Sequence, residues 1–186
     1  MSRSLVAMRE ATLTDVEQLA ELWQPYLRRG AADEALNDVA TAIERIVDRP
    51  SERLVIAEYD GAFAGAVLLK AAPYSPVNSE LVLQVHHLTV ESRHRRHGVG
   101  KALLETAVTW AEELGIGQVA TAVASGSREA NRFMARLALG PQAVLRLAPT
   151  CAVRAKLSSR QSAGRQVTQV LAVRRTLRST RSVAGR

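Results

Sequence analysis

Cysteine is the scarcest informative residue in this 186-residue chain, because Cys151 is the only one. A single cysteine excludes an internal disulfide and a cysteine-based zinc site, and it fits a reducing compartment. No apolar run approaches the roughly 18 residues of a membrane span. The N-terminus also has no continuous apolar segment of the signal-peptide type. We therefore expect a cytoplasmic protein with no membrane partner.

Acidic residues are absent from the last part of the chain. Residues 151–186 carry nine of the 25 Lys and Arg residues and none of the 18 Asp and Glu residues. Residues 1–150 keep 16 basic and 18 acidic residues, so the net charge of +7 comes from the tail. We expect one folded domain over residues 1–150 and a basic C-terminal extension over residues 151–186, either helical or disordered.

The basic extension could bind nucleic acid or an acidic surface. No aromatic residue lies among its charges, so base stacking is excluded and only salt-sensitive phosphate contacts remain. We favour the simpler interpretation, in which the tail packs on the domain or stays solvated. Apolar residues indicate two short helices in it: Val153 and Leu157, then Val167, Val170, Leu171 and Leu177.

The most informative stretch is a basic loop between an apolar strand, residues 81–90, and a helix with apolar residues at steps of three and four, residues 99–114. Gly98 and Gly100 lie at the start of that helix. A glycine turn at a helix start gathers unpaired backbone N–H groups and partial positive charge, which makes an anion site. Four cations surround it, so we expect a ligand with several negative charges: Arg93, Arg95, Arg96 and Lys101.

The other elements follow from periodicity and turn residues, in the order β-α-α-β-β-β-α-β-α-β. Three consecutive strands in the middle distinguish this order from simple β-α alternation. The full set begins with a strand over 5–11, a helix capped by Thr12 or Thr14 and a helix over 33–48. It continues with strands 54–59 and 62–70 around Asp60-Gly61, a loop over 71–79, strand 81–90, helix 99–114, strand 118–124, helix 128–139 and strand 143–147.

Neither a dinucleotide-binding fingerprint nor a P-loop fits the glycines. Arg95-x-x-Gly98-x-Gly100, preceded by Leu88-x-Val90, resembles the coenzyme A pyrophosphate loop of the GNAT superfamily of N-acetyltransferases, whose pattern is Gln/Arg-x-x-Gly-x-Gly/Ala. With the element order, the resemblance covers roughly residues 5–148. It implies an α+β fold, an αβα sandwich around a mixed, mostly antiparallel central sheet. It also implies a splayed strand pair at the coenzyme A site.

The resemblance implies acetyl-CoA as co-substrate and no metal. The strand backbone of Leu88, Thr89 and Val90 would pair with the pantetheine arm and polarise the thioester carbonyl. The loop would hold the pyrophosphate through Arg95, Arg96, His97, Gly98, Val99, Gly100 and Lys101. Ser127 stands where the family has Asn, and either Ser127 or Asn131 would contact the coenzyme. For Asn131, a solvated helix face fits equally well.

Catalysis in this family is direct attack by an amine on the thioester, which requires a base because an alkylammonium has a pKa near 10.4. In arylalkylamine-type members, a strand histidine stands two residues before the Leu of Leu-x-Val. His86 has that place here, so His86 is the first candidate base and Glu91 the second. A buried, hydrogen-bonded structural histidine is the alternative. All four histidines of the chain lie close together in sequence, at His86, His87, His94 and His97. They make a poor zinc site because the neighbouring arginines would repel a cation.

The sequence departs from the family at Met134. Members often carry a tyrosine there, in Phe-Tyr-x-x-x-Gly-Phe, as the acid that protonates the departing thiolate. Methionine cannot donate a proton, so water would have to do so, or the protein would bind acetyl-CoA without efficient catalysis.

The sequence thus predicts an acetyl-CoA-dependent N-acetyltransferase acting on a primary amine of a small molecule or protein. Two alternatives stay open. One is a non-catalytic acyl-CoA-binding module whose tail engages nucleic acid or a partner protein. The other is an acetyltransferase of a nucleic-acid-bound amine, such as aminoacyl-tRNA. A homodimer is compatible with the sequence, and the acceptor has no readable signature.

Overall fold

The computed structural model describes residues 6–28, 31–124 and 126–158. The chain divides into two compact units, Met1–Gly140 and Pro141–Arg186. Among the described residues, no helix combines the length and the apolar character needed to cross a membrane. The functional boundary at residue 150 stays a prediction.

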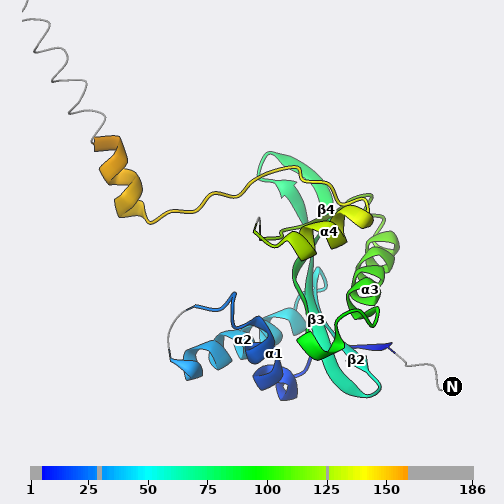
Figure 1. Ribbon diagram of the computed structural model, residues 1–186. Helices are drawn as coiled ribbons and strands as arrows, with labels where there is room; N and C mark the ends of the chain where they lie inside the picture. The colour runs from blue at the N-terminus through cyan, green and yellow to red at the C-terminus, as the bar shows by residue number, and fades with distance from the viewer. Residues whose placement is uncertain (1–5, 29–30, 125, 159–186) are drawn as a thin grey trace, which may run out of the picture. The chain divides into compact units, whose positions relative to one another are not determined.

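Within the described part of the first unit, five strands form one sheet in the order β1-β2-β3-β4-β5 (Figure 1). The first three neighbouring pairs are antiparallel, and β5 pairs parallel to β4. The expected mixed, mostly antiparallel sheet is therefore confirmed. The strands are β1 (Val6–Glu10), β2 (Glu52–Tyr59), β3 (Ala62–Ser75), β4 (Asn78–Val90) and β5 (Val119–Thr121).

Helices cover both faces of the sheet, which confirms the αβα sandwich (Figure 1). α1 (Val16–Trp23) and α2 (Ala32–Val47) pack on one face, and α3 (Val99–Glu113) packs on the other. β2 is apolar throughout its middle because alternate side chains serve both layers. Leu54 and Ile56 lie in the core with α1 and α2, whereas Val55 and Ala57 lie in the core with α3.

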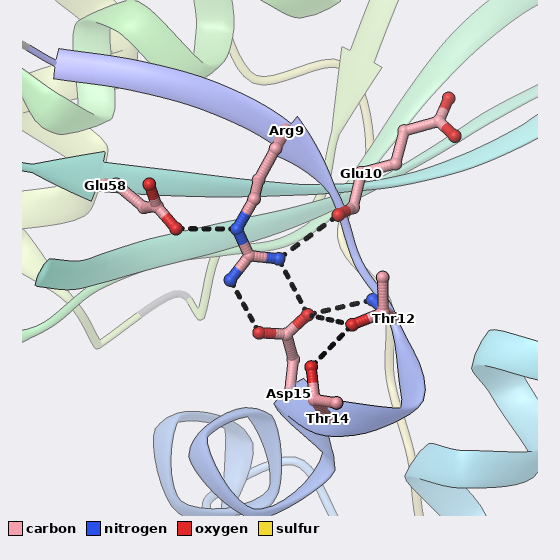
Figure 2. Close-up of polar contacts among 6 residues, drawn as sticks. All are labelled: Arg9, Glu10, Thr12, Thr14, Asp15 and Glu58. Carbon is pink, nitrogen blue, oxygen red and sulfur yellow. Dashed lines mark hydrogen bonds and ion pairs between the residues drawn. The ribbon is translucent and has the colours of Figure 1, made fainter. Parts of the chain in front are cut away.

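An ion-pair network connects β1 to the start of α1 (Figure 2). Arg9 donates to both carboxylate oxygens of Asp15 at 2.6 and 2.8 Å, and to Glu58 on β2 at 2.6 Å. The Thr12 amide also donates to Asp15, which closes a capping box around the turn η1 (Leu13–Asp15). Thr12, one of the two predicted caps, is therefore the N-cap residue of η1, whereas Asp15 is the N-cap residue of α1. The hydrogen bonds from Arg9 keep the pKa of the buried Asp15 carboxyl below its ordinary value.

The prediction of a loop over residues 71–79 is wrong. β3 runs on to Ser75 and β4 starts at Asn78, so these strands form a long hairpin that pairs Pro73 with Leu81. The pairing of β3 with β2 ends at Lys70, followed only by a bond from the Ala71 amide to the Ser51 carbonyl at 2.8 Å, so among the described strands the other edge of β3 has no partner at Pro73. A proline is tolerated on such an edge because no neighbouring strand needs its missing N–H.

The expected strand over residues 143–147 is also wrong, because this stretch has no regular secondary structure. Its apolar residues Val144, Leu145 and Leu147 are 73%, 92% and 96% exposed. An apolar strand-like pattern needs a partner strand before it becomes a strand, and these residues have none among the described part of the chain.

Two elements are shorter than expected. β5 ends at Thr121, and α4 (Arg128–Arg136) ends before Leu139 because Ala138 takes a left-handed conformation with φ of 62°. In the second unit, residues 150–158 are helical, as expected for the segment with Val153 and Leu157. The second expected tail helix lies outside the described residues.

Candidate functional site

The predicted coenzyme site lies where β4 runs on beyond β5. The last pair of the two strands is Val85 with Thr121, and the Thr121 hydroxyl closes it by donating to the Val85 carbonyl at 2.9 Å. β4 then continues to Val90 while still paired with β3 on its other side. One edge of β4 is therefore open over residues 86–90 among the described strands, which is the expected splayed pair.

The open edge presents backbone groups. The amide of Glu91 donates to the Ala64 carbonyl at 2.9 Å, so it points toward β3. Because backbone groups alternate in direction along a strand, the amide of Val90 points toward the open edge. A ligand lying along this edge could pair with β4 as an added strand would.

A β-bulge interrupts β4 at this edge. Leu68 pairs with His86 and Ala66 pairs with Thr89, so two residues, His87 and Leu88, lie opposite one residue of β3. His87 has a φ of +51°, in the left-handed region. The extra residue changes the alternation of side chains, with the result that Leu88 packs on the core under α3.

The carbonyl of His87 receives two hydrogen bonds. The indole Nε1 of Trp23, the last residue of α1, donates at 2.8 Å, and the Thr89 hydroxyl donates at 2.9 Å. The His87 ring also packs on Trp23 and Tyr26, with ring centroids 5.7 and 4.7 Å apart. The bulge is therefore held from the α1 side of the sheet.

The basic loop leads from β4 through the turn η2 (Ser92–His94) into α3. Gly98 has a φ of +85° and is the N-cap residue of α3. The first intrahelical bond runs from Ala102 to the Gly98 carbonyl at 3.0 Å, so the amides of the first turn have no intrahelical acceptor. Such amides and the helix dipole favour an anion, so the geometry is compatible with the anion site, which stays a prediction.

The two loop glycines differ in how strongly the chain itself favours glycine. A Cβ at Gly98 would meet nothing within 4 Å, so its positive φ is what favours glycine there. At Gly100, a Cβ would approach Val90 Cγ2 to 3.5 Å and Phe133 Cζ to 3.7 Å, which are ordinary contacts. The chain itself would accept alanine at position 100, as the family pattern Gly/Ala also implies.

The cations around the loop are solvent-exposed. Arg95 lies 3.6 Å from Glu129, and Lys101 lies 3.1 Å from Glu105. For Arg96, no acidic partner lies within ion-pair distance among the described residues. Exposed ion pairs contribute little to stability, so these side chains can turn to a polyanionic ligand at small cost.

His94 and His97 pack against β2. Their ring centroids lie 5.5 and 5.0 Å from that of Tyr59. His94 Nε2 is buried with no hydrogen-bond partner in the described part of the chain, and it lies 3.7 Å from Glu91 Oε2. Both rings therefore anchor the loop on the sheet, and a contact of His97 with a ligand would come from its backbone.

The first candidate base, His86, is half-buried on β4. Its Nε2 lies 3.1 Å from Oε1 of Gln84. Burial lowers the pKa of His86, nearby Lys70 lowers it further, and Glu52 partly opposes the shift. This lowered pKa favours the neutral imidazole, which a base must be, and a hydrogen-bonded structural histidine has the same features.

The second candidate base, Glu91, is already engaged. Its carboxylate accepts a hydrogen bond from Arg93 Nε at 2.7 Å and lies beside His94. An amine would have to compete with the guanidinium for this carboxylate, which makes Glu91 the weaker of the two candidates.

The predicted coenzyme contacts near α4 have structural roles. The Ser127 hydroxyl accepts a bond from the Ala130 amide at 3.4 Å and so caps α4. The side-chain amide of Asn131 donates to the carbonyls of Ala124 and Ser127 at 3.2 and 2.7 Å. Met134 is buried, with 7% of its surface exposed.

Three residues near the site were not found by sequence reasoning. Trp23 looked like one more apolar residue on a helix face, and Gln84 and Tyr59 belong to no recognised motif. Trp23 and Tyr59 act through contacts with histidines that are distant in sequence, whereas Gln84 contacts His86, two residues further along the same strand. Among the described residues, no group of three or more His, Cys, Asp or Glu side chains could hold a metal ion.

Comparisons with known proteins identify a family and similar folds. A family model described as the acetyltransferase (GNAT) family matches residues 16–139. No curated protein matches the sequence. The fold is similar to that of a transcriptional regulator from Bacillus halodurans C-125, which is 20% identical with a TM-score of 0.67, over 78% of this chain and 100% of that chain.

Two further solved structures are similar. One is glucosamine-6-phosphate N-acetyltransferase from Arabidopsis thaliana, 16% identical with a TM-score of 0.61, over 78% of this chain and 99% of that chain. The other is an aminoglycoside N-acetyltransferase in complex with CoA, 20% identical with a TM-score of 0.64, over 80% of this chain and 97% of that chain. At these identities, the similarity is evidence of the fold alone.

Proposed function

Because this chain belongs to the GNAT family of acetyltransferases, we propose that it is an acetyl-CoA-dependent N-acetyltransferase that modifies a primary amine of a small molecule or protein. The observation that carries this proposal is the open edge of β4 beside the free amides at the start of α3. One element offers strand-like pairing and the other offers an anion site, and acetyl-CoA needs both.

In this proposal, the pantetheine arm lies along Leu88, Thr89 and Val90. The pyrophosphate lies on the amides of residues 96–101, where Arg95, Arg96 and Lys101 supply positive charge. Phe133, Leu88 and Val90 lie around Gly100 and provide an apolar wall. Ser127 and Asn131 contribute by shaping the turn before α4.

The reaction is a direct transfer. The neutral amine attacks the thioester carbonyl carbon, and backbone amides at the open edge stabilise the negative charge on its oxygen. The carbon–sulfur bond then breaks and coenzyme A leaves as the thiolate, which takes a proton from water because Met134 cannot supply one. His86 accepts the proton that the amine loses.

A second candidate function is a non-catalytic acyl-CoA-binding module, which the buried Met134 in place of an acid favours. It would use the basic tail to engage a partner. Deleting residues 151–186 separates these functions if the domain stays folded, because a small-molecule enzyme keeps its rate and a tail-dependent module loses its partner. Cys151 is a free and exposed thiol, which agrees with a proposed cytoplasmic location.

The first experiment is a calorimetric titration with acetyl-CoA, followed by measurement of thiol release with a panel of amines and peptides. Binding with turnover supports the enzyme, whereas binding without turnover across the panel favours the module. Absence of binding would overturn both.

The anion site is tested by Gly98→Leu, with Gly115→Leu as matched control. Both glycines have a positive φ, 85° at Gly98 and 67° at Gly115, and no described atom lies within 4 Å of an added Cβ, so both variants carry backbone strain of the same kind. Gly115 lies past the far end of α3. We expect Gly98→Leu alone to abolish coenzyme binding. Equal affinity in the two variants would refute the site.

A further inference from the structure

The bond between Trp23 and the β4 bulge joins two parts of the domain that are 64 residues apart in sequence. Trp23 is the last residue of α1 and is only 6% exposed. A buried indole N–H needs an acceptor, and here the acceptor is the carbonyl of His87. α1 is thereby attached to the backbone of β4 next to the open edge.

The bulge needs such support. A non-glycine residue rarely adopts the left-handed conformation that His87 takes, and a bulge loses part of the regular strand pairing. The two donors on the His87 carbonyl, from Trp23 and Thr89, hold this residue in the bulge conformation. Without the indole N–H, the strand could relax to regular pairing or to another bulge.

A relaxed strand would present different groups at the open edge. The bulge is what puts Leu88 on the same side as Val85, three residues earlier, and it therefore also sets the direction of the backbone groups that follow His87. In the proposed complex, those groups meet the thioester carbonyl. A hydrogen bond to this oxygen depends on direction, so small changes in the bulge would weaken it.

We propose that Trp23 is a positioning residue for acetyl transfer: its indole N–H holds the β4 bulge in the conformation that aims the backbone of Leu88–Val90 at the thioester carbonyl of acetyl-CoA. This inference rests on the proposed function. It assigns Trp23 no contact with substrate, and it distinguishes the N–H group of Trp23 from the contribution of its ring to the core.

The test uses Trp23→Phe, which removes the N–H and keeps an aromatic ring. The matched control is Trp110→Phe, which shortens the other tryptophan, a buried residue of α3 in the opposite core. The probe is acetyl-CoA labelled with carbon-13 at the thioester carbonyl. Isotope-edited infrared spectroscopy measures the shift of its stretching frequency on binding, since a hydrogen bond to the oxygen lowers that frequency.

We expect the full-length wild-type protein and Trp110→Phe to lower the carbonyl frequency equally. Trp23→Phe should lose at least about half of this shift while its affinity for CoA changes less than about twofold, because the pyrophosphate site is untouched. Adding His87→Gly to Trp23→Phe should restore the shift, since glycine adopts a positive φ without support. A purely structural role for Trp23 predicts no such rescue.

The outcomes separate the two levels of the proposal. If wild type does not bind acetyl-CoA, the proposed function fails and this inference fails with it. If wild type binds with a shifted carbonyl and Trp23→Phe shows the same shift, the function stands and the inference is overturned. A carbonyl that is unshifted in bound wild type overturns it as well. If Trp23→Phe does not fold, the double variant is compared with His87→Gly alone. A smaller carbonyl shift in the double variant overturns the inference, because a bulge with glycine should not need the indole N–H.

Discussion

Oε1 of Gln84 lies 3.1 Å from Nε2 of His86, two residues further along β4. An amide oxygen accepts a hydrogen bond, so this contact assigns the imidazole proton to Nε2 and the lone pair to Nδ1. Nδ1 is then the atom that would take a proton from an attacking amine. The pair thus gives His86 a defined tautomer, which a general base requires.

Gln84→Glu should move the pH dependence of the reaction. A carboxylate beside His86 favours the imidazolium, so the pKa of His86, now lowered by burial and Lys70, would rise. Because the base must be neutral, the acid limb of the kcat/KM profile would move to higher pH. Gln84→Met, which removes the acceptor without adding charge, is the control and should not move the limb upward. Identical profiles for wild type and Gln84→Glu would exclude His86 as the base.

Asp15→Asn should destabilise the fold by about 1–3 kcal/mol at pH 7, because a buried carboxylate loses charged hydrogen bonds. The folded-state pKa of Asp15 is lowered below the ordinary value of 3.8, chiefly by its hydrogen bonds with Arg9. Its stabilisation is therefore fully present above the unfolded-state pKa and is lost as the pH falls through the folded-state pKa. Urea unfolding at pH 7 and in acid measures this effect.

The control for Asp15 is Asp38→Asn, which removes an exposed partner of Arg28. Exposed pairs contribute about 0–1 kcal/mol, so this variant should stay near wild type at both pH values. The difference between wild type and Asp15→Asn should shrink in acid. A difference that is independent of pH would mean that the ionised carboxylate is not what stabilises the network in Figure 2.

Gly65→Ala should disturb the strand pair next to the site. A Cβ at Gly65 would lie 2.6 Å from the carbonyl oxygen of Thr89 and 3.2 Å from Cα of Val90, and both are backbone atoms that cannot turn aside. We expect a loss of about 1–3 kcal/mol in unfolding free energy, as for overpacked sites, and weaker acetyl-CoA binding. Gly117→Ala, where a Cβ meets nothing within 4 Å, is the control. Equal thermal stability of both variants would contradict the close approach of β3 and β4.

Local patterns predicted much of this fold because their causes are local. Asp60-Gly61 forms the expected hairpin turn, with φ values of 51° and 79°. The apolar period of α3 and the left-handed Gly115 beyond its end follow from neighbouring residues alone. The glycines of the predicted anion site are also local features, since a positive φ at Gly98 can be inferred from the residue being glycine.

The missed features depend on contacts between distant segments. Pro73 suggested a loop, and only the free edge of β3 explains why a strand tolerates it. Position 87 is neither glycine nor asparagine, the residue types that usually adopt a positive φ. The conformation of His87 is supported instead by Trp23 on another element. The apolar run at 143–147 shows the reverse case, a strand pattern without a partner strand among the described residues.

Met134→Tyr should accelerate acetyl transfer if release of the thiolate limits the rate. Met134 is the buried residue at the position where the family often has its acid, and a positioned acid commonly contributes about 10²–10⁴-fold. We expect at least about a tenfold rise in kcat with little change in KM for acetyl-CoA, because the hydroxyl acts on the leaving group. Met134→Phe is the matched control, since it has the same ring without the hydroxyl and should not gain. A gain shared by both variants would point to repacking of α4. No gain in either would mean that water already protonates the thiolate fast enough, and that a step other than thiolate release limits turnover.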